Sequence, residues 1–155
     1  MEHRQPPPDL QIEFFGRPKL LSIIRSAVDE MCRSLGMPAE ESSRICLAVD
    51  EAVCNVIRHG YDEDPDKRIE LWITAPRKPR HAMLIEILDR AREVDPKTIR
   101  SRDLDDVRPG GLGVHIISEI MDEVAYQPRE GGGMHLRMQY VMKSSVPSGS
   151  SPQDG

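Results

Sequence analysis

The segment that most constrains the fold is the run of residues 39–59, which has the length and the periodicity of one long helix. Pro38 precedes the run, Glu40 and Glu41 suit the positive first turn of a helix, and Gly60 follows the last turn. The apolar residues of the run recur every three or four positions and form one stripe. They are Ile45, Ala48, Val49, Ala52 and Val56. A helix of this kind must bury its stripe against another layer of structure.

The rest of the chain supplies that layer. Apolar and polar residues alternate in several short segments, as they do in strands with one buried face. The expected elements, in chain order, are a strand (10–15), a helix (18–36), the long helix (39–59), two strands (69–74 and 82–88), a short helix (111–121) and two strands (122–127 and 134–140). Residues 82–88 are interpreted as a strand that is apolar on both faces. This order predicts an α+β fold, a two-layer α/β sandwich whose helices cover one face of a mixed, mostly antiparallel sheet.

The two ends of the chain differ in composition from its middle. Residues 1–8 contain three consecutive prolines, and residues 144–155 consist largely of serine, proline and glycine. Neither end has enough apolar surface to bury, so both are predicted to be disordered. The folded part is therefore expected to be one domain over residues 9–143, which is long enough for a core of its own.

Composition excludes several classes of function. A net charge of −5 argues against direct binding of nucleic acid, which depends on clustered Lys and Arg. No apolar run is long enough for a membrane helix, and the first residues lack the apolar core of a secretory signal. Cys32, Cys46 and Cys54 are odd in number and lie in apolar helical patterns. They are interpreted as buried free thiols in a reducing cytoplasm.

The long helix also carries polar residues that its apolar surroundings do not explain. Glu51 and Asn55 stand four positions apart, so they share a helix face beside the apolar stripe. An amide oxygen is a suitable ligand for Mg²⁺, and a carboxylate one turn away could accept a proton during phosphoryl transfer. The alternative is a solvent-edge Glu51 and a hydrogen-bonded, structural Asn55.

Two further features point to a nucleotide. Residues 109–114 read PGGLGV at the start of the predicted short helix, where backbone N–H groups could approach phosphate oxygens. A helix-capping turn is the alternative, and neither a Walker A loop nor a Rossmann fingerprint is present. Asp89 ends an apolar strand, and its carboxylate could accept a hydrogen bond from the amino group of adenine. Asp89 could equally be a turn residue, and Gly131–Gly133 reads as a hairpin turn.

In this order, the features resemble the GHKL ATPase superfamily of the Bergerat fold, specifically the bacterial anti-sigma factor serine kinases, over about residues 14–140. LAVDEAVCNVIRHGY at residues 47–61 is similar to that family's N box. ILDRAREVDP at residues 87–96 is similar to the first glycine box, and RPGGLGVHII at residues 108–117 to the second. The resemblance implies that Glu51 is the catalytic base and Asn55 the Mg²⁺ ligand.

The resemblance also implies which residues contact ATP. Together with Asn55 they come from the N box and the two glycine boxes: Arg58, His59, Asp89, Ala91, Val94, Arg108, Gly110, Gly111, Leu112, Gly113, Val114 and His115. Asp89 would bind adenine. His59 is expected to line the pocket or end its helix, and His115 to touch phosphate or to pack. One departure is clear: the first box normally carries glycine where this chain has Ala91, with Arg92 following.

The implied function is an ATP- and Mg²⁺-dependent serine/threonine protein kinase that acts as an anti-sigma factor. Its expected partners are an anti-sigma factor antagonist of the STAS type, a sigma factor and a second copy of the chain. The alternative is a partner-switching module that transfers no phosphate, which the altered first glycine box favours. Hydrolysis of ATP by the same fold is a third possibility. A histidine kinase is not expected, because no helical dimerisation segment with a phosphoacceptor His precedes the domain.

Overall fold

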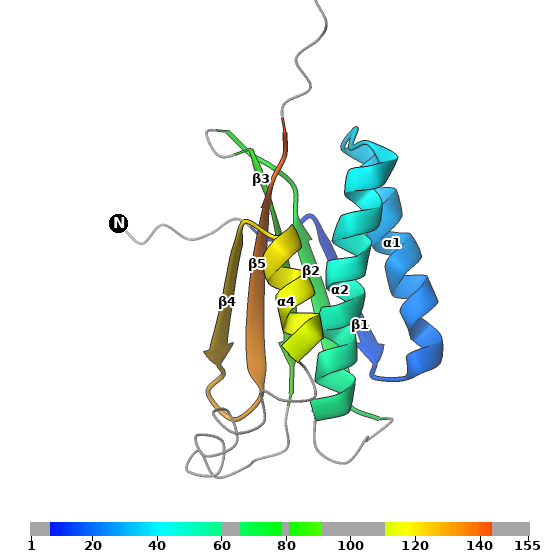
Figure 1. The fold of residues 1–155 in the computed structure, drawn as a ribbon. Coiled ribbons are helices and arrows are strands. Elements are labelled where there is room, and N and C mark those ends of the chain that lie inside the picture. The colour runs from blue at the N-terminus through cyan, green and yellow to red at the C-terminus, as the bar shows by residue number, and fades with distance from the viewer. Residues whose placement is uncertain (1–6, 60–65, 79–80, 91–110, 144–155) are drawn as a thin grey trace, which may run out of the picture.

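The computed structural model describes residues 7–59, 66–78, 81–90 and 111–143. Within these ranges the helices cover one face of a five-stranded sheet (Figure 1). The elements are β1 (Leu10–Phe15), a short 3-10 helix (Pro18–Leu20), α1 (Leu21–Ser34), α2 (Ala39–His59), β2 (Arg68–Thr74), β3 (Ala82–Asp89), α4 (Gly111–Ile120), β4 (Glu123–Pro128) and β5 (Met134–Val141). The predicted two-layer α+β fold is confirmed. The disorder predicted for the two ends concerns residues that lie largely outside the described ranges.

The sheet has the strand order β1-β2-β3-β5-β4, and all four pairings are antiparallel. Its central strand, β3, aligns Ile87 with Leu71 of β2 and Ile85 with Met138 of β5. These four side chains are at most 1% exposed, because they point toward the helices and form the centre of the core. The sheet therefore presents one apolar face to α1 and α2.

The long helix buries the stripe that its sequence predicts, with one adjustment. Ile45, Ala48, Val49 and Ala52 are at most 1% exposed, and Val53 joins them at 0%. Val56 is only partly buried at the edge of the core. Helix α1 packs beside α2, and its first predicted turn is the short 3-10 helix that begins at Pro18. Among the described helices, none combines the length and the apolar character needed to cross a membrane.

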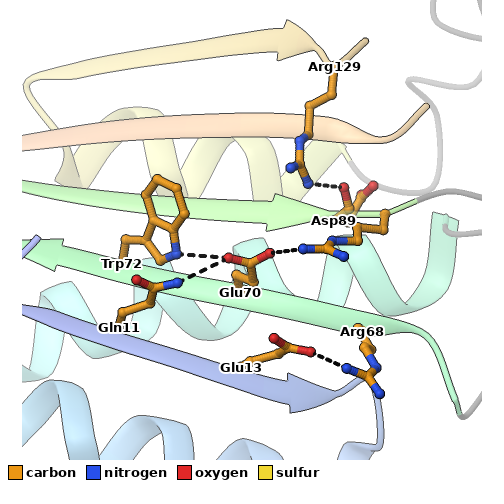
Figure 2. Close-up of polar contacts among 8 residues, drawn as sticks. Gln11, Glu13, Arg68, Glu70, Trp72, Asp89 and Arg129 are labelled. Carbon is orange, nitrogen blue, oxygen red and sulfur yellow. Dashed lines mark hydrogen bonds and ion pairs between the residues drawn. The ribbon is translucent and has the colours of Figure 1, made fainter. Parts of the chain in front are cut away.

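The second face of β3 differs from the prediction. This strand was expected to be apolar on both faces, but Glu86 is a buried charge at 7% exposure on the face away from the helices. It is tolerated because His135 Nε2 lies 2.8 Å and Arg137 Nε 3.3 Å from its Oε1. The neighbouring Glu70 of β2 accepts hydrogen bonds from Trp72 and Arg90 in the same way (Figure 2). Buried carboxylates with polar partners thus lie on the outer face of β2 and β3.

The cysteines agree with the prediction in part. Cys32 and Cys46 are buried free thiols, whereas Cys54 is only partly buried. Burial raises the pKa of the Cys32 thiol to about 11 and also raises the pKa of Cys46. Both buried thiols therefore stay protonated at neutral pH and act as small apolar side chains.

A hydrogen bond between the last strand and the first turn of α2 makes stability depend on pH. Tyr140 Oη donates to Glu41 Oε2 at 2.9 Å, and burial, followed by this hydrogen bond, raises the pKa of Tyr140 to about 12. An unfolded tyrosine has a pKa of about 10. The stabilisation is therefore complete below about pH 10 and is lost as the pH rises toward 12. We expect the difference in unfolding free energy between wild type and Tyr140→Phe to shrink over this range in urea titrations; a difference that stays constant would contradict the assignment.

Candidate functional site

The candidate site lies where three elements meet at one end of the molecule. The C-terminal end of α2, the start of α4 and the end of β3 all lie at the lower edge of Figure 1. Helix α4 packs directly against α2. Glu51 and Asn55 of α2 lie against Gly113 of α4, and Asp89 ends β3 at the same end of the molecule. All four were predicted as site residues.

The two helices approach each other closely at Gly113, which is buried. A Cβ atom on this residue would lie 2.7 Å from Glu51 Oε2 and 3.4 Å from Asn55 Oδ1. Only a residue without a side chain lets the first turn of α4 reach these two polar groups without moving them. The backbone of the second glycine box is therefore placed against the two polar side chains of the N box.

Glu51 and Asn55 are partly buried and available to a ligand. Among the described residues, neither side chain forms a hydrogen bond or an ion pair. The interpretation of Asn55 as a structural, hydrogen-bonded amide thus has no partner to support it in this part of the chain. Polar groups between two helices without internal partners have the character of a binding site rather than of a structural contact.

Asp89 occupies a fixed corner between β3 and β5. It is 8% exposed, and its Oδ1 accepts a hydrogen bond from the Met134 amide at 3.0 Å. Its main-chain oxygen accepts one from Arg129 Nη1 at 2.8 Å (Figure 2). Lys67 Nζ lies 3.7 Å from Oδ2. The carboxylate is held from two sides, which a simple turn residue would not need.

Gly133 completes this corner. Its φ is +96°, and a Cβ atom would lie 2.2 Å from the main-chain oxygen of Asp89. The three glycines at 131–133 were predicted only as a hairpin turn, and all three do have positive φ. No spacing in the sequence predicts the contacts of Lys67 and Arg129 with Asp89, because each of these residues is distant from Asp89 in the chain.

Some of the remaining residues predicted to contact ATP lie within the described ranges, and the others do not. Several are exposed beside the site: Arg58, Leu112 (73%) and Val114 (39%), and the side chain of His115 is 67% exposed. His115 therefore does not pack into the core, which had been the alternative to a phosphate contact. Gly111 begins α4 and His59 ends α2. The others lie outside the described residues and stay predictions: Ala91, Val94, Arg108, Gly110 and the side chain of His59.

Comparisons with known proteins agree with the fold. Residues 14–140 match the model of the histidine kinase-like ATPase domain. The serine-protein kinase RsbW of Halalkalibacterium halodurans is 26% identical over 140 residues, which cover 85% of this chain and 82% of the relative. The matched region contains α1, α2, α4, β2, β3 and β4 completely, and it includes the end of β1 and most of β5.

Two solved structures share the fold. The SiaB-SiaC complex from Pseudomonas aeruginosa matches with a TM-score of 0.61 and 17% identity, covering 86% of this chain and 89% of that one. The RsbU and RsbW domains of Rv1364c from Mycobacterium tuberculosis match with a TM-score of 0.57 and 14% identity, covering 86% of this chain. This chain spans only 33% of that longer structure. The family match, which covers most of the sequence, shows that the chain belongs to the histidine kinase-like ATPase domain family.

Proposed function

We propose that this chain is an ATP- and Mg²⁺-dependent serine/threonine protein kinase that acts as an anti-sigma factor in the bacterial cytoplasm. It transfers the γ-phosphoryl group of ATP to a hydroxyl side chain of an anti-sigma factor antagonist of the STAS type, and in its other state it binds a sigma factor as a homodimer. One observation carries the proposal: Glu51 and Asn55, without partners among the described residues, face the glycine turn of α4. The similarity to a serine-protein kinase over 85% of the chain supports the same activity.

The chemistry follows from this arrangement. The start of α4 offers backbone N–H groups and the positive end of a helix dipole, which attract phosphate oxygens. The Glu51 carboxylate lies against this turn, so it is close to where a hydroxyl would attack the terminal phosphate. Glu51 then accepts the proton of that hydroxyl as the new oxygen–phosphorus bond forms, while the bond between the γ-phosphorus and the oxygen bridging it to the β-phosphate breaks and ADP leaves. Asp89, at the end of β3, binds the amino group of adenine.

The residues present suit a magnesium ion that is shared with the nucleotide. No group of three or more His, Cys, Asp or Glu side chains in the described ranges could hold a metal ion alone. The Asn55 amide oxygen beside Gly113 can supply one ligand, and Mg²⁺ typically takes the others from phosphates and water. The ion would neutralise negative charge on the phosphates.

Removal of this ligand should uncouple ATP binding from magnesium. We expect wild-type protein to bind ATP more tightly with Mg²⁺ than with EDTA, and Asn55→Ala to lose most of that difference, because the amide oxygen that links ion and helix is gone. Isothermal titration calorimetry in both buffers measures the ratio. Ser43→Ala, an exposed change on the same helix, is the control. An unchanged magnesium effect in Asn55→Ala would remove Asn55 from the metal site.

The activity itself is tested by transfer of label. The protein is incubated with ATP labelled at the γ-phosphate and with candidate antagonist proteins from the same organism, and acid-stable phosphate on Ser or Thr is the expected product. Saturable binding of ATP without transfer to any candidate would favour the partner-switching module, whose support is the alanine and arginine at positions 91 and 92. No saturable binding at millimolar ATP would exclude the kinase.

A further inference from the structure

A nearly buried ion pair joins Asp89, the proposed adenine ligand, to Lys67, which has no role in the proposed function. Lys67 Nζ and Asp89 Oδ2 are 3.7 Å apart, and their side chains are only 9% and 11% exposed. Lysine is seldom buried without a strong reason, because its ammonium loses hydration. At 3.7 Å the two groups attract each other but do not form a good hydrogen bond. The pair therefore leaves hydrogen-bonding capacity unused.

The neighbouring residues show where the hydrogen-bonding groups of Lys67 and Asp89 lie relative to the helices. Asp89 pairs with Ile69 across β2 and β3, and Lys67 precedes that residue by two positions. A Cβ atom on Gly16 would lie 3.4 Å from the Lys67 main-chain oxygen and 3.6 Å from Cγ1 of Ile57. The Lys67 main chain thus lies near the last turns of α2, and its side chain reaches Asp89, which shares the helix-covered face of the sheet with its buried partner Ile69.

The hydrogen bonds of Asp89 leave one oxygen for a ligand. Its Oδ1 is committed to the Met134 amide, so Oδ2 is the atom that can accept from a bound base. The Lys67 ammonium beside Oδ2 has three N–H donors, and no other partner of this side chain is found among the described residues. The acceptor Oδ2 of Asp89 and the donor Nζ of Lys67 therefore lie next to each other, and both side chains are almost inaccessible to solvent.

We propose that Lys67 and Asp89 read the edge of adenine together, with Asp89 Oδ2 accepting from the 6-amino group and Lys67 Nζ donating to ring nitrogen N1. This inference rests on the proposed function. Adenine presents an amino donor next to a ring-nitrogen acceptor, which complements a carboxylate next to an ammonium. Hypoxanthine and guanine present the opposite order, an oxygen acceptor next to an N–H donor. The pair thus selects ATP over 6-oxo nucleotides, and Lys67 becomes a specificity-determining residue.

The test compares three nucleotides by isothermal titration calorimetry: ATP, 1-deaza-ATP, which lacks N1, and inosine triphosphate, which lacks the 6-amino group. Hydrogen bonds to a charged group justify an expected loss of roughly tenfold or more for wild type with 1-deaza-ATP. Lys67→Met should bind ATP and 1-deaza-ATP equally, because the donor to N1 is gone. Lys19→Met, an exposed change in the 3-10 helix, should keep the wild-type ratio.

The outcomes separate the two proposals. If wild type binds ATP and 1-deaza-ATP equally well, Lys67 does not donate to N1, and this result alone overturns the inference. The proposed binding of ATP is then unaffected. If Lys67→Met loses the discrimination against inosine triphosphate but keeps that against 1-deaza-ATP, Lys67 only positions Asp89 and the inference is again overturned. If wild type binds none of the three nucleotides, the proposed function itself fails. Lys67→Gln keeps an N–H donor, so it should retain part of the preference for ATP over 1-deaza-ATP. This variant replaces Lys67→Met in the test if Lys67→Met does not fold.

Discussion

Glu51→Ala is expected to lower the rate of phosphoryl transfer by about 10²–10⁴-fold, the usual contribution of a general base, while the affinity for ATP stays unchanged. The reason is geometric. The carboxylate lies against Gly113 at the start of α4, where it can reach an attacking hydroxyl. It makes no hydrogen bond or ion pair with other described residues, so its loss should not disturb the fold. Single-turnover transfer to the antagonist and calorimetric titration with ATP measure the two quantities.

The matched control is Glu40→Ala, which removes an exposed carboxylate from the first turn of the same helix. It should leave the transfer rate at the wild-type value. A Glu51→Ala protein that phosphorylates the antagonist at the normal rate would show that another group takes the proton. A variant that loses ATP binding together with transfer would instead assign Glu51 to the nucleotide site.

Gly133→Ala is expected to destabilise the protein by roughly 2–5 kcal/mol, the sum of a positive-φ penalty and of overpacking. Its φ of +96° disfavours any residue with a Cβ atom, and that atom would lie 2.2 Å from the Asp89 main-chain oxygen. Because the neighbouring atom belongs to the backbone, no side-chain rotation can relieve the contact. Urea or guanidinium unfolding measures the free energy, and ATP affinity should fall as the Asp89 corner is displaced.

Gly131→Ala separates the two causes. Gly131 has a φ of +82° in the same turn, but a Cβ atom there would meet nothing within 4 Å. The Gly131→Ala substitution should therefore lower the free energy of unfolding only by the conformational penalty of about 1–2 kcal/mol, and it should leave the affinity for ATP unchanged. Equal losses in the two variants would mean that the contact with Asp89 contributes nothing.

Local periodicity predicted most of the fold. Helix α2 begins and ends at the predicted residues, since Pro38 and Gly60 bracket an uninterrupted apolar stripe. The four-residue spacing of Glu51 and Asn55 also fixed their common face in advance. In contrast, the small shift of the buried stripe from Val56 toward Val53 depends on how the helix rotates against the sheet. Periodicity alone does not determine that rotation.

The contacts around Asp89 could not be predicted for a different reason. Lys67 is 22 positions before Asp89 and Arg129 is 40 positions after it, so no spacing rule links them. Their meeting depends on the strand order, which places β3 between β2 and β5. The same dependence explains Glu86, whose partners lie on β5 and make a buried charge acceptable in an apolar strand.

At position 113, a substitution could remove phosphoryl transfer without unfolding the protein. A methyl group there would meet the end of the flexible Glu51 side chain rather than backbone, so the carboxylate can turn away while the helices stay packed. One added carbon atom would then convert a phosphoryl-transferring enzyme into a folded protein whose proposed catalytic base is displaced. A relative with alanine at this position is therefore expected to be a binding protein with an intact fold, and a change of that kind lies a single nucleotide substitution away from any glycine codon.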